Sequence, residues 1–202
     1  MRQVASMLVL ALGVSCGRPQ EQRINVSDVF RGVEPLSTLD GVRLPLTVEE
    51  LLRARPGANP HAYFGMSERI GSGEIRYGVA DLVPTGEENF RIRPEDRVTS
   101  VGVFWTIPTE SDATLKWRQL LADVNHLAGQ DALCLSWGKV PYRGRTARWR
   151  FRSGTISMRQ QFSDSARQQG RWVAVPTELS LQLEVDTAEA EELGTLPRVP
   201  CL

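Results

Sequence analysis

Apolar residues recur with a helical period over residues 112–128. They stand three or four positions apart, as on the buried side of an amphipathic helix. The set comprises Trp117, Leu120, Leu121, Val124, Leu127 and Ala128. Gly129 follows directly, and glycine commonly ends helices because it adopts the left-handed conformation at low cost. We therefore predict a long helix over 112–128.

A shorter helix is predicted over residues 47–55. Thr47 can accept a hydrogen bond at the start of this helix, and Glu50, three residues later, completes a capping box. Pro56 and Gly57 then end the run, because proline lacks the backbone N–H that would continue it.

Strict alternation of apolar and polar residues predicts strands after each helix. After the short helix we expect strands over 62–70, 74–83 and 97–107, with a tight turn at Gly71-Ser72-Gly73 between the first two. After the long helix we expect them over 132–140, 146–152, 155–162 and 172–186. This order predicts an α+β fold, with an antiparallel sheet covered on one face by two helices. It is also compatible with two tandem helix-plus-meander units, 38–110 and 111–202.

The start of the chain has the pattern of an export signal. Arg2 precedes an apolar run that extends to Val14, and small residues stand just before Cys16. The run is too short to cross a bilayer as a helix, since that needs roughly 20 apolar residues. We therefore predict a signal peptide over residues 1–15 and an exported protein.

Residues 12–16, Leu-Gly-Val-Ser-Cys, resemble the lipobox of bacterial lipoproteins, in which the cysteine is acylated after cleavage. The resemblance implies lipidation of Cys16, a tether over 16–37 and one domain over 38–202. Because no Asp follows the cysteine, it also implies an anchor in the outer membrane, facing the periplasm. Secretion without a lipid is the alternative, since the same small residues suit ordinary signal cleavage.

Two cysteines remain when Cys16 is set aside. In an exported protein an even number of cysteines predicts a disulfide, here between Cys134 and Cys201. That bridge would tie the C-terminus to the strand after the long helix. A catalytic thiol at Cys134 is the alternative, because His126 and Asp131 are close to it in sequence.

The net charge gives no argument for a nucleic-acid partner, and the expected export to the envelope argues against one. The 24 Lys and Arg residues equal the 24 Asp and Glu residues in number, so the formal net charge is zero. Nucleic-acid binding proteins usually carry a strongly basic face or domain. No global field of this chain would attract a polyanion.

No catalytic, metal or cofactor motif stands out. The two histidines, His61 and His126, lack the Cys or carboxylate spacing of a metal site. No Ser lies in a nucleophile-elbow pattern, and helix capping or solvation accounts for the paired acids. We therefore predict neither an enzyme nor a cofactor. A hydrolase whose site is assembled only in space is the alternative.

A basic and aromatic strand forms the candidate binding face. Three arginines are expected to project from one side of it: Arg148, Arg150 and Arg152. Trp149 and Phe151 would then enter the core. Such a row can hold an anionic partner through bidentate guanidinium contacts. The alternative is a solvated face balanced by Glu184 and Asp186.

The segment from Gly41 to Leu51, followed by Pro56, resembles the opening of small envelope lipoproteins of the SmpA/OmlA type and of the β-lactamase-inhibitor-protein-like fold. Units of these proteins begin with a Gly, an apolar residue, a Thr and a short helix before a meander. The resemblance covers residues 38–83, with a fainter echo over 112–162.

That resemblance implies a protein that works by contact with another envelope protein and has no catalytic residues. We therefore expect a protein-interaction or structural module of the cell envelope, held at the membrane by its N-terminal lipid. A periplasmic protein that binds a ligand or the cell wall is the alternative.

Overall fold

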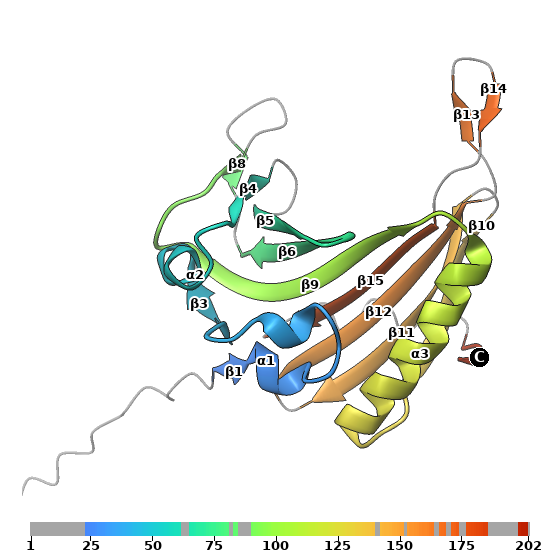
Figure 1. Ribbon diagram of the computed structural model, residues 1–202, viewed down its shortest axis with the longest axis horizontal. Coiled ribbons are helices and arrows are strands. Elements are labelled where there is room, and N and C mark those ends of the chain that lie inside the picture. Colours follow the sequence, from blue (N-terminus) through green and yellow to red (C-terminus); the bar gives the residue numbers. More distant parts are fainter. Residues whose placement is uncertain are drawn as a thin grey trace, which may run out of the picture.

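The computed structural model describes residues 23–61, 65–80, 83–84, 90–139, 142–151, 153–163, 166–168, 171–173, 177–185 and 198–201 (Figure 1). The predicted signal peptide and Cys16 lie outside the described residues. Among the helices that the structure describes, none has the length and apolar character needed to cross a membrane.

The helical elements are α1 (Val26–Val29), the 3-10 turn η1 (Leu36–Thr38), α2 (Val48–Ala54) and α3 (Glu110–Ala128). The strands of the first half are β1 (Ile24–Asn25), β2 (Arg43–Leu44), β3 (Leu46–Thr47), β4 (Asn59–His61), β5 (Gly65–Ile70), β6 (Gly73–Val79), β7 (Val83–Pro84), β8 (Phe90–Arg91) and β9 (Arg97–Ile107). Those of the second half are β10 (Leu133–Lys139), β11 (Tyr142–Phe151), β12 (Gly154–Ser163), β13 (Ala166–Gln168), β14 (Arg171–Val173) and β15 (Thr177–Glu184).

The main sheet has nine strands in the order β10-β11-β12-β15-β9-β6-β5-β4, with β3 also paired to β9. Every neighbouring pair in it is antiparallel. The predicted α+β class with an antiparallel sheet is confirmed.

The chain order within this sheet repeats. Helix α2 precedes the meander β4-β5-β6-β9, and α3 precedes the meander β10-β11-β12-β15. The two meanders join where β9 pairs with β15. Each has a two-stranded insert before its last strand, β7/β8 in the first and β13/β14 in the second.

One predicted strand is split in two. Residues 172–186 were expected to form a single strand, but β14 ends at Val173 and β15 begins at Thr177. The first piece pairs with β13, whereas the second pairs with β12 and β9. Pro176 stands between the pieces, and a proline cannot donate the N–H that a central strand needs.

Helix ends follow the predicted capping chemistry. The side chain of Thr47 accepts from the backbone N–H of Glu50 at 3.2 Å, and the Glu50 carboxylate accepts from that of Thr47 at 2.9 Å. These hydrogen bonds, with Arg23 beside the carboxylate, hold the pKa of Glu50 below its ordinary value. At the C-terminal end of α3, Gly129 caps the helix in the left-handed conformation, with φ 62°.

Helix α3 packs on the sheet through the apolar residues that its period predicts. Its buried side chains are Ala113, Trp117, Leu120, Leu121 and Val124. Leu127, in the last turn, is 40 % exposed, so the buried side ends one turn earlier than the pattern predicts. The strands that contact its backbone are β15, β12 and β9.

Residues 24–37 belong to the folded domain, which corrects the expected tether over 16–37. Strand β1 pairs with β2, with Ile24 opposite Leu44. Four side chains of this segment are fully buried in the core: Val26, Phe30, Val33 and Leu36. Burial of an aliphatic or aromatic side chain contributes roughly 1.5–3 kcal/mol, which favours the folded position of this segment. The domain therefore begins well before residue 38.

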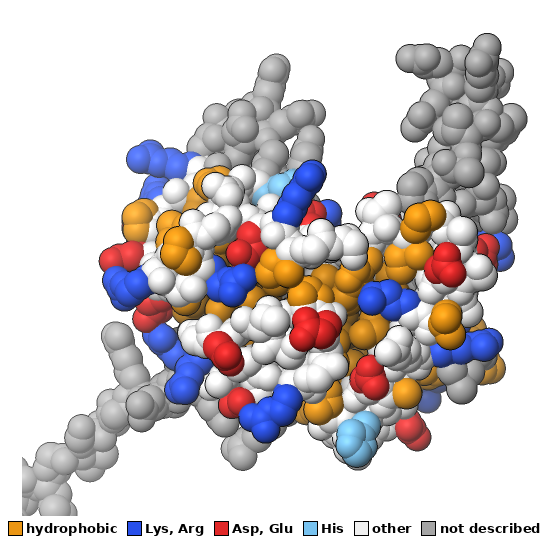
Figure 2. Space-filling model, in the orientation of Figure 1, with side chains coloured by type: hydrophobic (Ala, Val, Ile, Leu, Met, Phe, Trp, Pro, Cys, Tyr) orange, Lys and Arg blue, Asp and Glu red, His pale blue; other side chains and the backbone are white. Residues whose placement is uncertain are grey.

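The two faces of the sheet differ in character. One face carries the helices and the core, and its strand residues include Ile75, Val103, Leu181 and Met158. Figure 2, drawn from the side on which α3 lies, shows acidic and basic side chains interspersed rather than gathered by sign. We call the opposite side the open face, because no helix of the described residues packs on it. Its residues alternate with the core residues along β6, β9, β15, β12 and β11.

Gly102 of β9 lies on the open face and allows the sheet to bend sharply there. The curvature of β9 is visible in Figure 1. A Cβ on Gly102 would lie 2.8 Å from the carbonyl oxygen of Leu181 and 2.9 Å from the Cβ of Gln182. Gly102 is paired with Arg76 on one side and with Gln182 on the other. Only a residue without a side chain lets these strands approach so closely.

Candidate functional site

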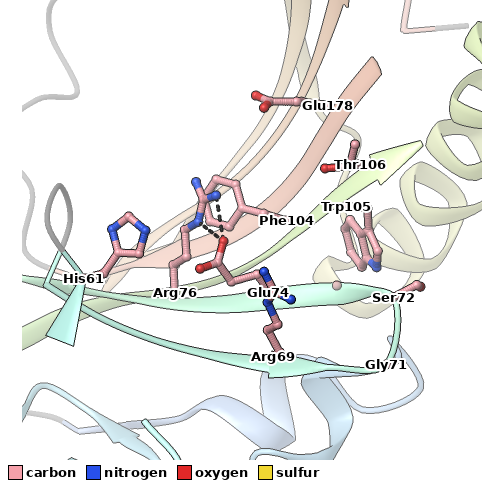
Figure 3. A pocket seen from close by; sticks show the side chains of 11 residues that line it. His61, Arg69, Gly71, Ser72, Glu74, Arg76, Phe104, Trp105, Thr106 and Glu178 are labelled. Carbon is pink, nitrogen blue, oxygen red and sulfur yellow. Dashed lines mark hydrogen bonds and ion pairs between the residues drawn. The ribbon is translucent and has the colours of Figure 1, made fainter. Parts of the chain in front are cut away.

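A polar pocket of about 420 Å³ lies on the open face, where β6, β9 and β15 meet (Figure 3). Volumes of this size are common for ligand sites. Its principal side chains come from β4, β5, β6, β9 and β15: His61, Arg69, Glu74, Arg76, Phe104, Thr106 and Glu178.

Strand register places these residues on one face. Glu74 of β6 stands opposite Phe104 of β9, and Thr106 of β9 stands opposite Glu178 of β15. Directly paired residues of an antiparallel sheet point to the same side, and so do residues two apart along a strand. Arg76 therefore joins Glu74 on the open face.

At the centre of the pocket, the Arg76 guanidinium lies against the Phe104 ring and the Glu74 carboxylate. The Arg76 guanidinium lies 4.0 Å from the centroid of the Phe104 ring. Its Nε donates to the Glu74 carboxylate at 2.8 Å, and its Nη2 lies 2.8 Å from the same oxygen. Arginine over an aromatic face gains both stacking and cation–π attraction, and the acid fixes its rotation.

Glu74 is held in its ionised form. Burial alone would raise the pKa of this carboxyl, but hydrogen bonds from Arg76 and Ser67, with the charge of Arg76, lower it below the ordinary value. His61 adds a smaller lowering of the same pKa. A carboxylate of this kind accepts hydrogen bonds and is poorly suited to donate a proton near neutral pH.

Two further charges flank this centre. Arg69 and Glu178 are exposed, and neither forms an ion pair with any residue that the structure describes. In Figure 3 the Glu178 carboxylate stands across the pocket from Arg76. The pocket thus presents charges of both signs around an aromatic ring, an arrangement suited to recognising a polar surface.

The described residues offer no metal-binding cluster of three or more His, Cys, Asp or Glu side chains. The pocket has hydroxyl groups at Ser72 and Thr106. Neither makes a hydrogen bond to His61 that would activate it as a nucleophile, as far as the described side chains show.

The predicted arginine face lies on the same side of the sheet but away from this pocket. Arg148 and Arg150 project from β11 onto the open face, and Arg152 lies outside the described residues. Arg148 shares a lateral row with Arg76, four strands away, which corresponds to about 19 Å at ordinary strand spacing. The two arginines instead line a smaller pocket of about 220 Å³ with Leu133 and Leu135.

One of the two aromatic residues of this strand enters the core as predicted. Trp149 is buried, and its indole N–H donates to the Asn125 side chain at 2.7 Å. Phe151 is 38 % exposed, contrary to the expectation. It is the last residue of β11 and pairs with Gly154, which has no side chain to cover it.

The predicted disulfide between Cys134 and Cys201 is present, with the two Cα atoms 5.3 Å apart. It ties the C-terminal segment to β10, as expected. Val199 adds a backbone hydrogen bond to Cys134, and the Trp117 indole donates to the Cys201 carbonyl at 3.0 Å. The bonded sulfur of Cys134 is no nucleophile, and His126 is exposed on α3.

Sequence reasoning missed the pocket of the open face. Alternation along β6 places Glu74 and Arg76 on one side, and that signal was readable. The approach of Phe104 and Glu178 depends on pairing between strands that are distant in sequence, which alternation does not specify. His61, considered above only as a metal ligand, ends β4 and lines the pocket.

Searches with this chain against protein-family models, curated proteins and solved structures find no match.

Proposed function

We propose that this protein is an exported lipoprotein of the bacterial cell envelope and binds another envelope protein through the open face of its sheet. The pocket around Arg76, Glu74 and Phe104 is the centre of the contact. Cys16 is the lipid attachment site, which holds the domain at the membrane, with the outer membrane as the anchor.

The observation that carries this proposal is the one-sided arrangement of the molecule. All of the described helices and the N-terminal segment from Ile24 bury their apolar residues against one face of the sheet. The other face keeps a polar pocket with a stacked arginine, and with Arg69 and Glu178, whose charges form no ion pair with the described part of the chain. Arginine and aromatic residues are enriched in protein interfaces, and flanking charges set partner choice.

Two further features agree with the envelope assignment. A disulfide persists in oxidising compartments, such as the periplasm, and is rare in the reducing cytosol. The order of helix then four-strand meander, twice over, agrees with the expected likeness to the β-lactamase-inhibitor-protein-like fold. Proteins of that type work by protein contact, which supports a binding role.

Site-specific photo-cross-linking tests the binding face. A photoreactive amino acid at Thr106, exposed in the pocket, is expected to give a discrete cross-linked product with an envelope protein in intact cells. The same amino acid at Gln119, exposed on α3, is the matched control and is expected to give none. Arg76→Gln in the Thr106 background should abolish most of the product, because it removes the cation stacked on Phe104.

Products of equal yield from Thr106 and Gln119 would contradict the proposed face. A product from Thr106 whose yield is unchanged by Arg76→Gln would contradict the role of the pocket.

A further inference from the structure

A second pocket, of about 500 Å³, lies at the other end of the sheet and shares no lining residue with the first. It is lined by Ser136, Trp137, Gly138, Arg143, Gly144, Arg145, Phe162 and Val199. Among the described residues, this lining contains two arginines and no Asp or Glu. Phe162 and Val199 provide apolar walls, so the pocket combines positive charge with apolar surface.

Arg145 is fixed in place by buried neighbours. Its guanidinium lies 4.3 Å from the centroid of the Trp117 ring and 5.7 Å from that of Phe162. Its Nε and Nη2 donate to the side-chain oxygen of Gln160, at 3.0 and 2.8 Å. Trp117 and Gln160 are both fully buried. A cation held in this way loses little further side-chain entropy when it binds a ligand.

The hydrogen-bonding capacity of Arg145 is only partly used. A guanidinium has five N–H donors, and two of these point to the single Gln160 oxygen. The other three donate to no acceptor among the described residues, and no described carboxylate lies within ion-pair distance. The Gln160 amide nitrogen is also buried without a described hydrogen-bond partner.

The charge of Arg145 has no ion-pair partner among the described residues. Burial, followed by the charge of Arg118, lowers the pKa of this guanidinium, while Glu110 opposes the shift. Arginine stays protonated even so, because its ordinary pKa is far above neutrality. A second cation, Arg143, stands 5.8 Å from the centroid of the Phe162 ring. Most half-buried cations in proteins are paired, and this one has a neutral amide where an acid would complete the pair.

We propose that this pocket binds a small molecule with an oxyanion, a carboxylate or phosphate group, on an apolar body, and that Arg145 recognises the oxyanion. The free N–H edge of Arg145 forms the hydrogen bonds, Arg143 adds attraction, and Phe162 contacts the apolar body. Gln160 orients the guanidinium without neutralising it. Because this pocket is separate from the one on the open face, its ligand is a second one beside the proposed protein partner.

Benzoate is the probe for this site, with acetate and benzylammonium as controls. Acetate keeps the charge without the ring, and benzylammonium keeps the ring with the opposite charge. Binding to the purified full chain is followed by calorimetry at low salt and by the ¹⁵N–¹H signal of the Arg145 Nε. We expect saturable benzoate binding that shifts this signal, at least about tenfold weaker acetate binding, and no shift with benzylammonium.

Gln160→Glu is the decisive variant, because it keeps the size of the side chain and supplies the acid that Arg145 lacks. It should weaken benzoate binding by about tenfold or more, as should Arg145→Gln, because each variant removes charged hydrogen bonds between the guanidinium and the ligand. Arg53→Gln, at an exposed position on α2, is the control and should leave the affinity within about twofold. Circular dichroism confirms that each variant is folded.

Failure of benzoate to bind the wild-type chain would overturn the proposal. Unchanged binding in both Gln160→Glu and Arg145→Gln would overturn it as well, as would equal binding of benzylammonium. None of these results bears on cross-linking from Thr106, so the two proposals fail separately.

Discussion

Replacing Cys134 and Cys201 together with alanine is expected to lower the free energy of unfolding by about 4 kcal/mol. The bridge closes a loop of 67 residues, and in the chain-entropy model its removal restores that freedom to the unfolded chain. The native C-terminal segment would also lose the bond that holds it beside β10, leaving mainly the contacts of Val199 and of the Trp117 indole. Urea denaturation of the two proteins, compared at one pH, measures the difference.

The reductant provides the control for this experiment. Dithiothreitol should lower the denaturation midpoint of the wild-type protein and leave that of the double variant unchanged. A wild-type midpoint that does not respond to complete reduction would contradict a stabilising bridge.

Replacing Glu68 with alanine is expected to cost about 3 kcal/mol, the lower end of the range for breaking a buried pair. The Arg55 Nε donates to its carboxylate at 2.8 Å, and the hydroxyl of the fully buried Tyr77 donates to the same oxygen. The side chains of Arg55 and Glu68 are only 21 % and 10 % exposed. Loss of the acid therefore leaves a cation and a hydroxyl buried without their acceptor.

The pKa values of Arg55 and Tyr77 both reflect their contact with the Glu68 carboxylate. Burial alone would lower the pKa of Arg55, but the hydrogen bond to Glu68 raises it. Burial, reinforced by Glu68, raises the pKa of Tyr77 above its ordinary value. Because Arg55 is the C-terminal cap of α2 and Tyr77 lies in β6, the cluster joins the short helix to the first meander.

Glu49→Ala is the matched control for Glu68→Ala. Glu49 pairs with Arg53 on the exposed side of α2, where an ion pair contributes about 0.5 kcal/mol or less. Urea denaturation should therefore separate the two variants clearly. Equal losses in both would contradict the role assigned to the buried cluster.

The fold class was predictable because α3 and most strands show their own hydrophobic period. The capping box at Thr47 and the left-handed Gly129 fixed helix ends, and the strand over 97–107 was predicted with its observed bounds. Residues 24–37 were misread because α1 has only four residues, too few to show a helical period. Their burial follows from long-range packing, which local patterns do not reveal.

The site was less predictable than the fold. Sequence selected the arginines of β11 because they cluster along one strand, whereas the pocket of the open face draws on five strands. Arg145 lies on the same strand but was not among the three arginines selected from the sequence. Arg145 is unusual because its hydrogen-bond partner is a neutral side chain, Gln160, on the neighbouring strand. Only the register between β11 and β12 places these two residues side by side.

The central claim, that the open face is covered by a partner in the cell, is tested most directly by thiol footprinting. Thr106→Cys and Ala122→Cys place single reporters on the open face and on the exposed side of α3. The account predicts that a maleimide labels both in the purified protein, and that in native envelopes only position 106 is protected. Equal labelling of position 106 in both preparations, or protection at position 122 alone, would contradict it.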